Sequence, residues 1–322
     1  MLIADSLMSA HLSAHRDPSR LSHSAERFRI VDSFSKVVRL GEGLARSNQL
    51  SEAAMQRTLA ALTTCAARIR AQGVSQVRAV ATEACRRASN GAQFVAEVQR
   101  VTGLTLDIIS SEEEARLGLD ACAPLLSSRF QHALVYDIGG GSTEVSFLQV
   151  PARGSYRLIS TASLPYGVVT LAEDPNARYE DIVRSVAARI RKLAFFAQVG
   201  AALSAGQVQF VGMSTTVTTL AALSKGLKRY NRNLIDGSRL KVSEMQQQIY
   251  RLRDIALRKD PMPSTIGRGR TDLVLPGCAV LEGIVSAWSF RATDVADRGL
   301  REGLLATLLA ETQPKAMQVG TA

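Results

Sequence analysis

A short segment rich in glycine and acid is the part of the sequence best suited to chemistry. It runs Asp137-Ile-Gly-Gly-Gly-Ser-Thr-Glu144 and follows an apolar stretch that is typical of a strand ending at Asp137. Its three glycines are Gly139, Gly140 and Gly141. Because glycine has no side chain, backbone N–H groups of such a turn can close around an anion, and the Ser142 hydroxyl adds a further donor. The segment therefore predicts a phosphate-binding turn.

Two carboxylates flank this turn. Asp137 and Glu144 would repel a phosphate bound between them unless a cation lay there as well. Carboxylate oxygens are ligands that Mg²⁺ prefers, and the ion is commonly shared between one or two carboxylates and the phosphates of a substrate. We therefore expect Asp137 and Glu144 to hold Mg²⁺. The alternative is a plain glycine-rich hairpin with one solvated acid at each end.

Size and composition limit the classes of function. The chain has 322 residues, of which 46% are hydrophobic and 21% charged, an ordinary composition for a globular protein of two domains. No run approaches the roughly 20 apolar residues of a membrane span, and the first residues do not form a secretion signal, so we expect a soluble, cytoplasmic protein. The four cysteines form no CxxC pair, which argues against a zinc site. The net charge of +10 suits a polyanionic partner. The alternative is an arginine excess that follows from the base composition of the coding DNA.

Strand and helix patterns alternate along most of the chain. They include two short strands over residues 28–40 and a helix of about 20 residues over 180–197. This alternation predicts an α/β protein with largely parallel sheets. We place one domain over residues 1–118, joined by a last helix over 298–312, and a second domain over 119–297.

The glycine turn resembles the second phosphate loop of the exopolyphosphatase and guanosine pentaphosphatase (Ppx/GppA) family. Further blocks are similar to the family in order and spacing: RLGEGL (39–44), VRAVATEACRRASNG (77–91), SSEEEARLG (110–118), TTVTTLAAL (215–223) and VADRGLREGLL (295–305). The resemblance implies a two-domain, actin-like and sugar-kinase-like (ribonuclease H-like) ATPase superfold. It also implies Mg²⁺-dependent release of terminal phosphate from inorganic polyphosphate or guanosine pentaphosphate (pppGpp).

The resemblance also implies roles for single residues. Glu114 matches the family glutamate that activates the attacking water, whereas an acidic helix start favoured by the helix dipole is the alternative for its two neighbours. Arg86 resembles a phosphate-binding arginine of the cleft, because a guanidinium can grip two phosphate oxygens. Arg87 is expected to be a surface charge. Arg39 is expected to face the phosphate, with a structural salt bridge as the alternative.

A third turn, Gly-Met-Ser214-Thr215-Thr, resembles another glycine turn of the family. We expect the Ser214 hydroxyl to contact phosphate. Thr215 stands where the family has glycine, and a β-branched residue disfavours positive φ. Close approach of a nucleotide or a long phosphate chain is therefore expected to be restricted here.

The beginning of the chain departs from the family pattern. The resemblance implies a first strand and a first phosphate loop of the type Asp-x-Gly-[Ser/Thr]-Asn, whereas the sequence begins Met-Leu-Ile-Ala, similar to the end of the next strand. We therefore expect the first domain to lack that strand and loop, either because the start is assigned too late or because the protein is truncated.

Three functions follow from these patterns. The first is the phosphohydrolase; the second is a catalytically impaired protein that binds polyphosphate or an alarmone; and a small-molecule kinase of the same superfold is a third. No membrane and no specific nucleic acid is expected as partner, and a homodimer is left open.

Overall fold

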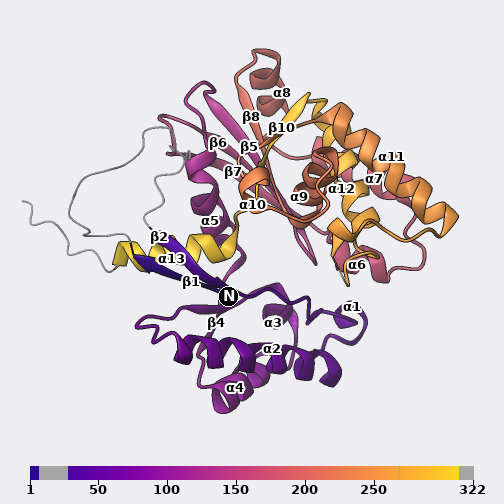
Figure 1. Cartoon of the computed structure of the whole chain (residues 1–322). Coiled ribbons are helices and arrows are strands. Elements are labelled where there is room, and N and C mark those ends of the chain that lie inside the picture. The colour runs from indigo at the N-terminus through magenta and orange to yellow at the C-terminus, as the bar shows by residue number, and fades with distance from the viewer. Residues whose placement is uncertain (7–27, 268, 312–322) are drawn as a thin grey trace, which may run out of the picture.

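The computed structural model describes residues 1–6, 28–267 and 269–311 (Figure 1). Its strands form two sheets of two strands in the N-terminal part and one sheet of six strands in the C-terminal part. The predicted α/β character is therefore confirmed. The expectation of largely parallel sheets is wrong, because four of the seven strand pairings in the described residues are antiparallel. Within the described ranges, no helix is both long enough and apolar enough to cross a membrane.

The described residues of the N-terminal part form four short strands and five helices. Strand β1 (Leu2–Ser6) pairs antiparallel with β2 (Phe28–Ser33), and β3 (Ala79–Ala81) pairs parallel with β4 (Leu106–Ile108). The helices are α1 (Leu44–Ser47), α2 (Glu52–Ala71), α3 (Glu83–Arg87), α4 (Gly91–Thr102) and α5 (Ser111–Cys122). Helices α2 and α4 pack on each other below the β3–β4 pair, with Phe94 and Val98 buried between them.

The prediction of two strands over residues 28–40 is wrong. The first of them is β2, but residues 34–39 form neither a strand nor a helix. After Phe34, whose N–H donates to the carbonyl of Met1, the chain leaves the β1–β2 pair. It crosses toward the C-terminal part, where the Arg39 guanidinium meets Asp272, and residues 34–39 pair with no strand in the described part of the chain.

The six-stranded sheet carries the glycine turn. Its strand order is β7-β6-β5-β8-β10-β9. The strands are β5 (His132–Ile138), β6 (Thr143–Gln149), β7 (Arg157–Leu164), β8 (Val208–Met213), β9 (Arg239–Lys241) and β10 (Ala292–Ala296). Strand β5 lies parallel to β8 and antiparallel to β6. Side chains of β5 alternate between the faces, with Leu134 and Tyr136 in the larger core and Ala133 and Val135 in a smaller one. This alternation fixes the register and brings Asp137 to the end of the strand.

Seven helices and two short 3₁₀ turns complete the part of the chain around this sheet. The helices are α6 (Val168–Glu173), α7 (Tyr179–Arg191), α8 (Phe196–Ser204), α9 (Thr215–Ser224), α10 (Arg232–Ile235), α11 (Val242–Arg258) and α12 (Val274–Trp288), and the 3₁₀ turns span Ala123–Leu125 and Ser264–Ile266. Helix α12 is buried over most of its length, packs closely on α7 and forms the centre of the larger core.

The prediction of one helix over residues 180–197 is wrong, because α7 and α8 are separate helices. The break lies between Arg191 and Phe196. Phe195 lies in the break, where it is buried and stacked on Phe147 of β6. Tertiary packing of this ring therefore interrupts a segment whose local sequence favours a continuous helix.

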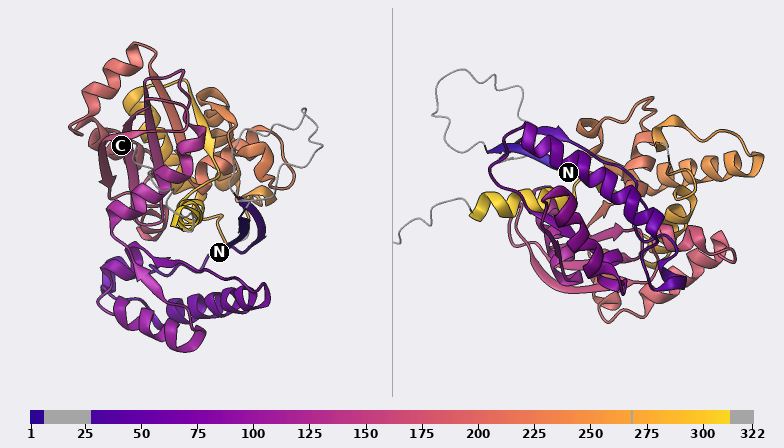
Figure 2. Two further views of the ribbon diagram at one scale, coloured as in Figure 1. Left: turned by 90° about the vertical axis from the view of Figure 1, so that its left-hand side faces the viewer. Right: turned by 90° about the horizontal axis from the view of Figure 1, so that it is seen from below.

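Helix α13 (Leu300–Glu311) returns to the N-terminal part and packs on α5 and β1 (Figure 2). The two helices approach so closely that a Cβ built on Gly303 would lie 2.1 Å from the carbonyl oxygen of Leu117. Glycine at this position therefore lets α13 hold α5 and its first turn in place. The domain boundaries at residues 118 and 297 and the lack of a first strand stay predictions.

Candidate functional site

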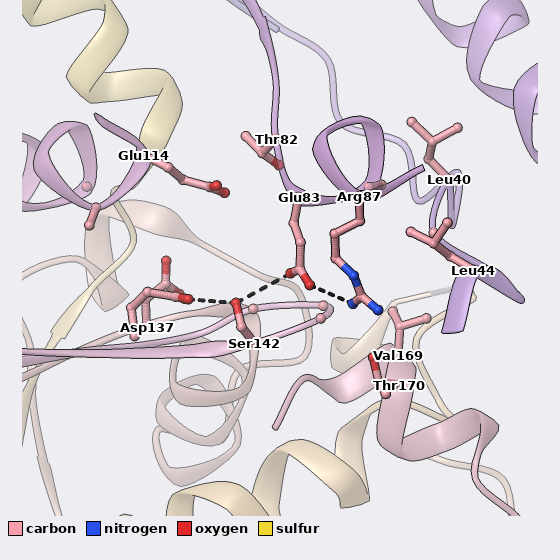
Figure 3. A pocket seen from close by; sticks show the side chains of 18 of the residues that line it. Leu40, Leu44, Thr82, Glu83, Arg87, Glu114, Asp137, Ser142, Val169 and Thr170 are labelled. Atoms are coloured by element: carbon pink, nitrogen blue, oxygen red, sulfur yellow. Dashed lines mark hydrogen bonds and ion pairs between the residues drawn. The ribbon is translucent and has the colours of Figure 1, made fainter. Parts of the chain in front are cut away.

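A cavity of about 310 Å³ lies between the N-terminal part and the six-stranded sheet. Segments that are far apart in the sequence line it: residues 39–45, 82–87, the first turns of α5, the glycine turn and α6. Figure 3 shows Glu114, Asp137 and Ser142 around this space. The structure thus brings the glycine turn and Glu114 to one cavity.

Helix α6 anchors the glycine turn through its backbone. The turn is closed by a hydrogen bond of 2.9 Å from the Gly139 N–H to the Ser142 carbonyl. The first N–H groups of α6 donate to the turn, Val168 N to the carbonyl of Gly139 at 3.0 Å and Val169 N to that of Gly140 at 2.9 Å. Two carbonyl groups of the turn are therefore fixed toward α6. Their oxygens would repel an anion on that side of the turn.

Gly167 is a further residue on which the turn depends, and the sequence patterns missed it. A Cβ built on Gly167 would lie 2.2 Å from the carbonyl carbon of Gly141 and 2.3 Å from the carbonyl oxygen of Gly140. Because both neighbours are backbone atoms, Gly167→Ala must displace the turn. We expect the free energy of unfolding to fall by about 1–3 kcal/mol and phosphate release to fall with it.

Denaturant unfolding of the purified variant measures this effect. Gly200→Ala is the matched control, because a Cβ at Gly200 in α8 meets no atom within 4 Å. That variant should be as stable as the wild type, or more stable by up to about 1 kcal/mol. Equal stability of Gly167→Ala and wild type would show that the turn is not packed as described.

The two flanking carboxylates, Asp137 and Glu144, face each other at paired positions of β5 and β6. The hydroxyls of Ser142 and Ser163 donate to Glu144 Oε1 at 2.6 and 2.8 Å. Burial, and then the charges of Glu144 and Glu114, raise the pKa of Asp137 to about 7. A cation between these oxygens would relieve the accumulated negative charge, so the donor set fits Mg²⁺.

Mg²⁺ fits this site only if ligands other than protein side chains complete its coordination. The described part of the chain contains no group of three or more His, Cys, Asp or Glu side chains arranged to hold a metal ion. Asp137 and Glu144 would therefore supply two ligands, and water and substrate phosphate the others, which is the usual coordination of Mg²⁺ by phosphate-transferring proteins.

Glu114 lies in the first turn of α5. Ser110 caps the start of this helix, and its hydroxyl accepts from the N–H of Glu113 at 3.1 Å. Burial raises the pKa of Glu114, against the effect of the Arg86 guanidinium. Arg86 Nη1 and Nη2 both lie 3.4 Å from Glu114 Oε2, and Nη1 donates to the Ile109 carbonyl at 2.7 Å. Arg86 is thus placed to orient Glu114, while its predicted contact with phosphate stays a prediction.

Two arginines, Arg39 and Arg87, line the cavity, both with carboxylate partners. Arg39 donates to Asp272 at 2.7 Å, so the alternative of a salt bridge is the arrangement that the structure contains. Arg87 donates to Glu83 at 2.9 Å. The Arg87 side chain is half-exposed, as expected of a surface charge, and it also lines the cavity, because residues four apart share one face of a helix and that face of α3 borders the cavity.

Ser214 lies in a second cavity of about 330 Å³ that shares Asp137, Gly139 and Gly140 with the first. Its backbone has φ of 125°, and its hydroxyl accepts from the N–H of Val217 at 3.3 Å. Thr215 is already the first residue of α9. The conformation that favours glycine therefore falls on Ser214 rather than on Thr215, and the expected restriction of close approach at Thr215 stays a prediction.

Comparison with known proteins identifies relatives of this chain. The model of the Ppx/GppA phosphatase family matches residues 21–312. The chain belongs to this family. Exopolyphosphatase 2 of Mycobacterium tuberculosis is 28% identical over 258 residues, which are 77% of this chain and 78% of that relative.

Solved structures agree with the family assignment. The Ppx/GppA family member of Aquifex aeolicus is 26% identical with a TM-score of 0.66, covering 89% of this chain and 92% of its own. An exopolyphosphatase from Cytophaga hutchinsonii, 20% identical with a TM-score of 0.77, covers 97% of this chain and 94% of its own and shows the same fold. The predicted two-domain α/β fold of the Ppx/GppA family is therefore confirmed.

Glu83 lines the cavity and was also missed by the sequence patterns. The spacing of Glu83 and Arg87 on α3 is a recognisable signal for an ion pair. The local sequence does not show that Glu83 lies against the glycine turn, because that turn lies more than fifty residues further along the chain.

Proposed function

We propose that the chain is a phosphohydrolase that releases the terminal phosphate of inorganic polyphosphate. Membership of a phosphatase family and similarity to an exopolyphosphatase support the reaction class. The observation that carries the proposal is that Glu114 and the glycine turn line one cavity. A nucleophile and a phosphoryl group can therefore be held within one small space.

Each group of cavity residues has a separate role in the proposed reaction. The glycine turn and Ser142 bind the terminal phosphoryl group. Asp137 and Glu144 would hold Mg²⁺, which would supply positive charge to the phosphate oxygens. Glu114 accepts a proton from water as the water oxygen forms its bond to phosphorus. The bond from phosphorus to the bridging oxygen breaks, leaving orthophosphate and a chain that is one unit shorter. Arg86 keeps the Glu114 carboxylate in position.

Phosphate release by the purified protein tests this proposal. With polyphosphate and Mg²⁺ we expect continuous release of orthophosphate, its loss when EDTA is added and its return with excess Mg²⁺. If polyphosphate raises the melting temperature without any release, the protein binds the polymer without turnover. If polyphosphate produces neither effect, the proposed function is wrong.

Guanosine pentaphosphate is the second candidate substrate, because it presents the same terminal phosphoryl group. The second cavity favours it: apolar side chains such as Ile138, Ile266 and Val274 and the hydroxyls of α9 line a space that adjoins the glycine turn. Such a mixture suits a nucleoside attached to the phosphates. The same assay with both substrates at equal concentration decides which is hydrolysed with the higher kcat/KM.

A further inference from the structure

Glu83 places a carboxylate directly on the glycine turn. The residue begins α3, and its side chain reaches toward Ser142, whose Oγ lies 3.4 Å from Glu83 Oε2 (Figure 3). A Cβ built on Gly141 would lie 2.3 Å from the same oxygen and 2.7 Å from the carboxylate carbon. The carboxylate therefore lies where a side chain of residue 141 would be, and glycine leaves the room for it.

A bound phosphoryl group would need this same place. To be held by backbone N–H groups of the turn, a phosphate must lie against the face of Gly141 that is free of side chains. A carboxylate and a phosphate are both anions with oxygen acceptors, so they repel each other at short range and cannot both lie there. The Glu83 side chain is 26% exposed, which leaves it an open side toward which it can swing.

Arg87 connects this displacement to phosphate binding. Its Nη1 donates to Glu83 Oε1 at 2.9 Å, while its side chain is 50% exposed and also lines the cavity. When the carboxylate leaves the turn, the guanidinium loses its partner. A guanidinium without a carboxylate partner binds two oxygens of a phosphate well. Movement of the Glu83 side chain would thus remove its carboxylate from the turn and leave the Arg87 guanidinium able to bind the phosphate.

The geometry points to Glu83 as a residue that determines specificity: its carboxylate occupies the glycine turn of the ligand-free protein, and a phosphoryl group displaces it and takes over Arg87. This inference rests on the proposed function, since it requires the turn to bind phosphate. The tethered carboxylate competes at a high effective concentration. Orthophosphate has a single phosphoryl group with which to compete, whereas polyphosphate keeps contacts through its other units. Glu83 therefore weakens binding of the product more than binding of the substrate.

Orthophosphate binding in the presence of Mg²⁺, followed by calorimetry, tests the inference without any turnover. Glu83→Ala removes the competing group and should lower the Kd of orthophosphate by about tenfold. Glu83→Gln keeps the size but removes the charge and should lower it less, and Arg87→Gln should raise it. In the hydrolysis assay, Glu83→Ala should lower the inhibition constant of orthophosphate by more than the KM of polyphosphate.

Glu97→Gln is the matched control, because Glu97 also pairs with an arginine, Arg100, but on the exposed surface of α4. It should leave the Kd unchanged. An equal Kd for Glu83→Ala and wild type, or a higher one for the variant, would overturn the role of Glu83. Undetectable binding to every variant would overturn it as well, and hydrolysis of polyphosphate by the wild type then decides whether the proposed function also fails.

Discussion

Replacing Glu114 by glutamine should slow phosphate release from polyphosphate by about 10²- to 10⁴-fold, the range expected for loss of a general base. The amide has nearly the shape of the carboxylate but cannot accept the proton of water. Burial raises the pKa of Glu114, which makes the carboxylate a stronger base. We expect kcat to fall while KM for polyphosphate changes little, because this residue acts on water rather than on the bound chain.

The neighbouring Glu112 provides the control for this experiment. It is exposed in the same turn of α5, and Glu112→Gln removes the same charge without entering the cavity. This variant should keep the activity of the wild type. Circular dichroism and the melting temperature of Glu114→Gln should match those of the wild type, since Arg86 keeps its hydrogen bond to the carbonyl of Ile109. A Glu114→Gln protein that retains more than a tenth of the wild-type kcat would contradict the assigned role.

The glycine hairpin is the part of the site that the sequence predicts best. Strand β5 is buried on both faces and reads as a continuous apolar run, and the three glycines allow a turn that returns the chain. Once this hairpin is recognised, pairing of Asp137 with Glu144 follows from its register. Local patterns therefore suffice wherever the interacting residues are close in the sequence.

Strand β7 illustrates what local patterns do not reveal. Its sequence, RLISTASL, lies at the edge of the sheet with most side chains exposed, so it lacks a clear alternation of apolar and polar residues. Gly167 and Glu83 are similar cases within the site. Each matters because of a neighbour in another segment, backbone atoms of the glycine turn for one and Gly141 for the other. Such contacts arise only from the tertiary fold.

Replacing Asp137 by asparagine should have opposite effects on stability and activity. Burial, followed by the charges of Glu144 and Glu114, raises the pKa of Asp137 from 3.8 to about 7 in the folded protein. Below pH 3.8 Asp137 is protonated in both the folded and the unfolded chain, so its burial as a charge does not lower the free energy of unfolding. Between the two values the unfolded chain loses its proton first, so the free energy of unfolding falls as pH rises. Above pH 7 the full cost remains, on the order of 2–4 kcal/mol.

Chemical unfolding of the metal-free proteins at pH 8 should therefore find Asp137→Asn more stable than the wild type by roughly this amount, with the difference vanishing near pH 4. Asp181→Asn, at an exposed ion pair with Arg184, should stay within about 0.5 kcal/mol of the wild type. Adding Mg²⁺ should stabilise the wild type but not Asp137→Asn, because the cation compensates the carboxylate charge and the amide has none to compensate. Phosphate release by Asp137→Asn should fall by about 10²-fold or more. A variant that is less stable than the wild type at pH 8 would mean that Asp137 already has a favourable partner in the metal-free protein, and the case for a cation at this position would fail.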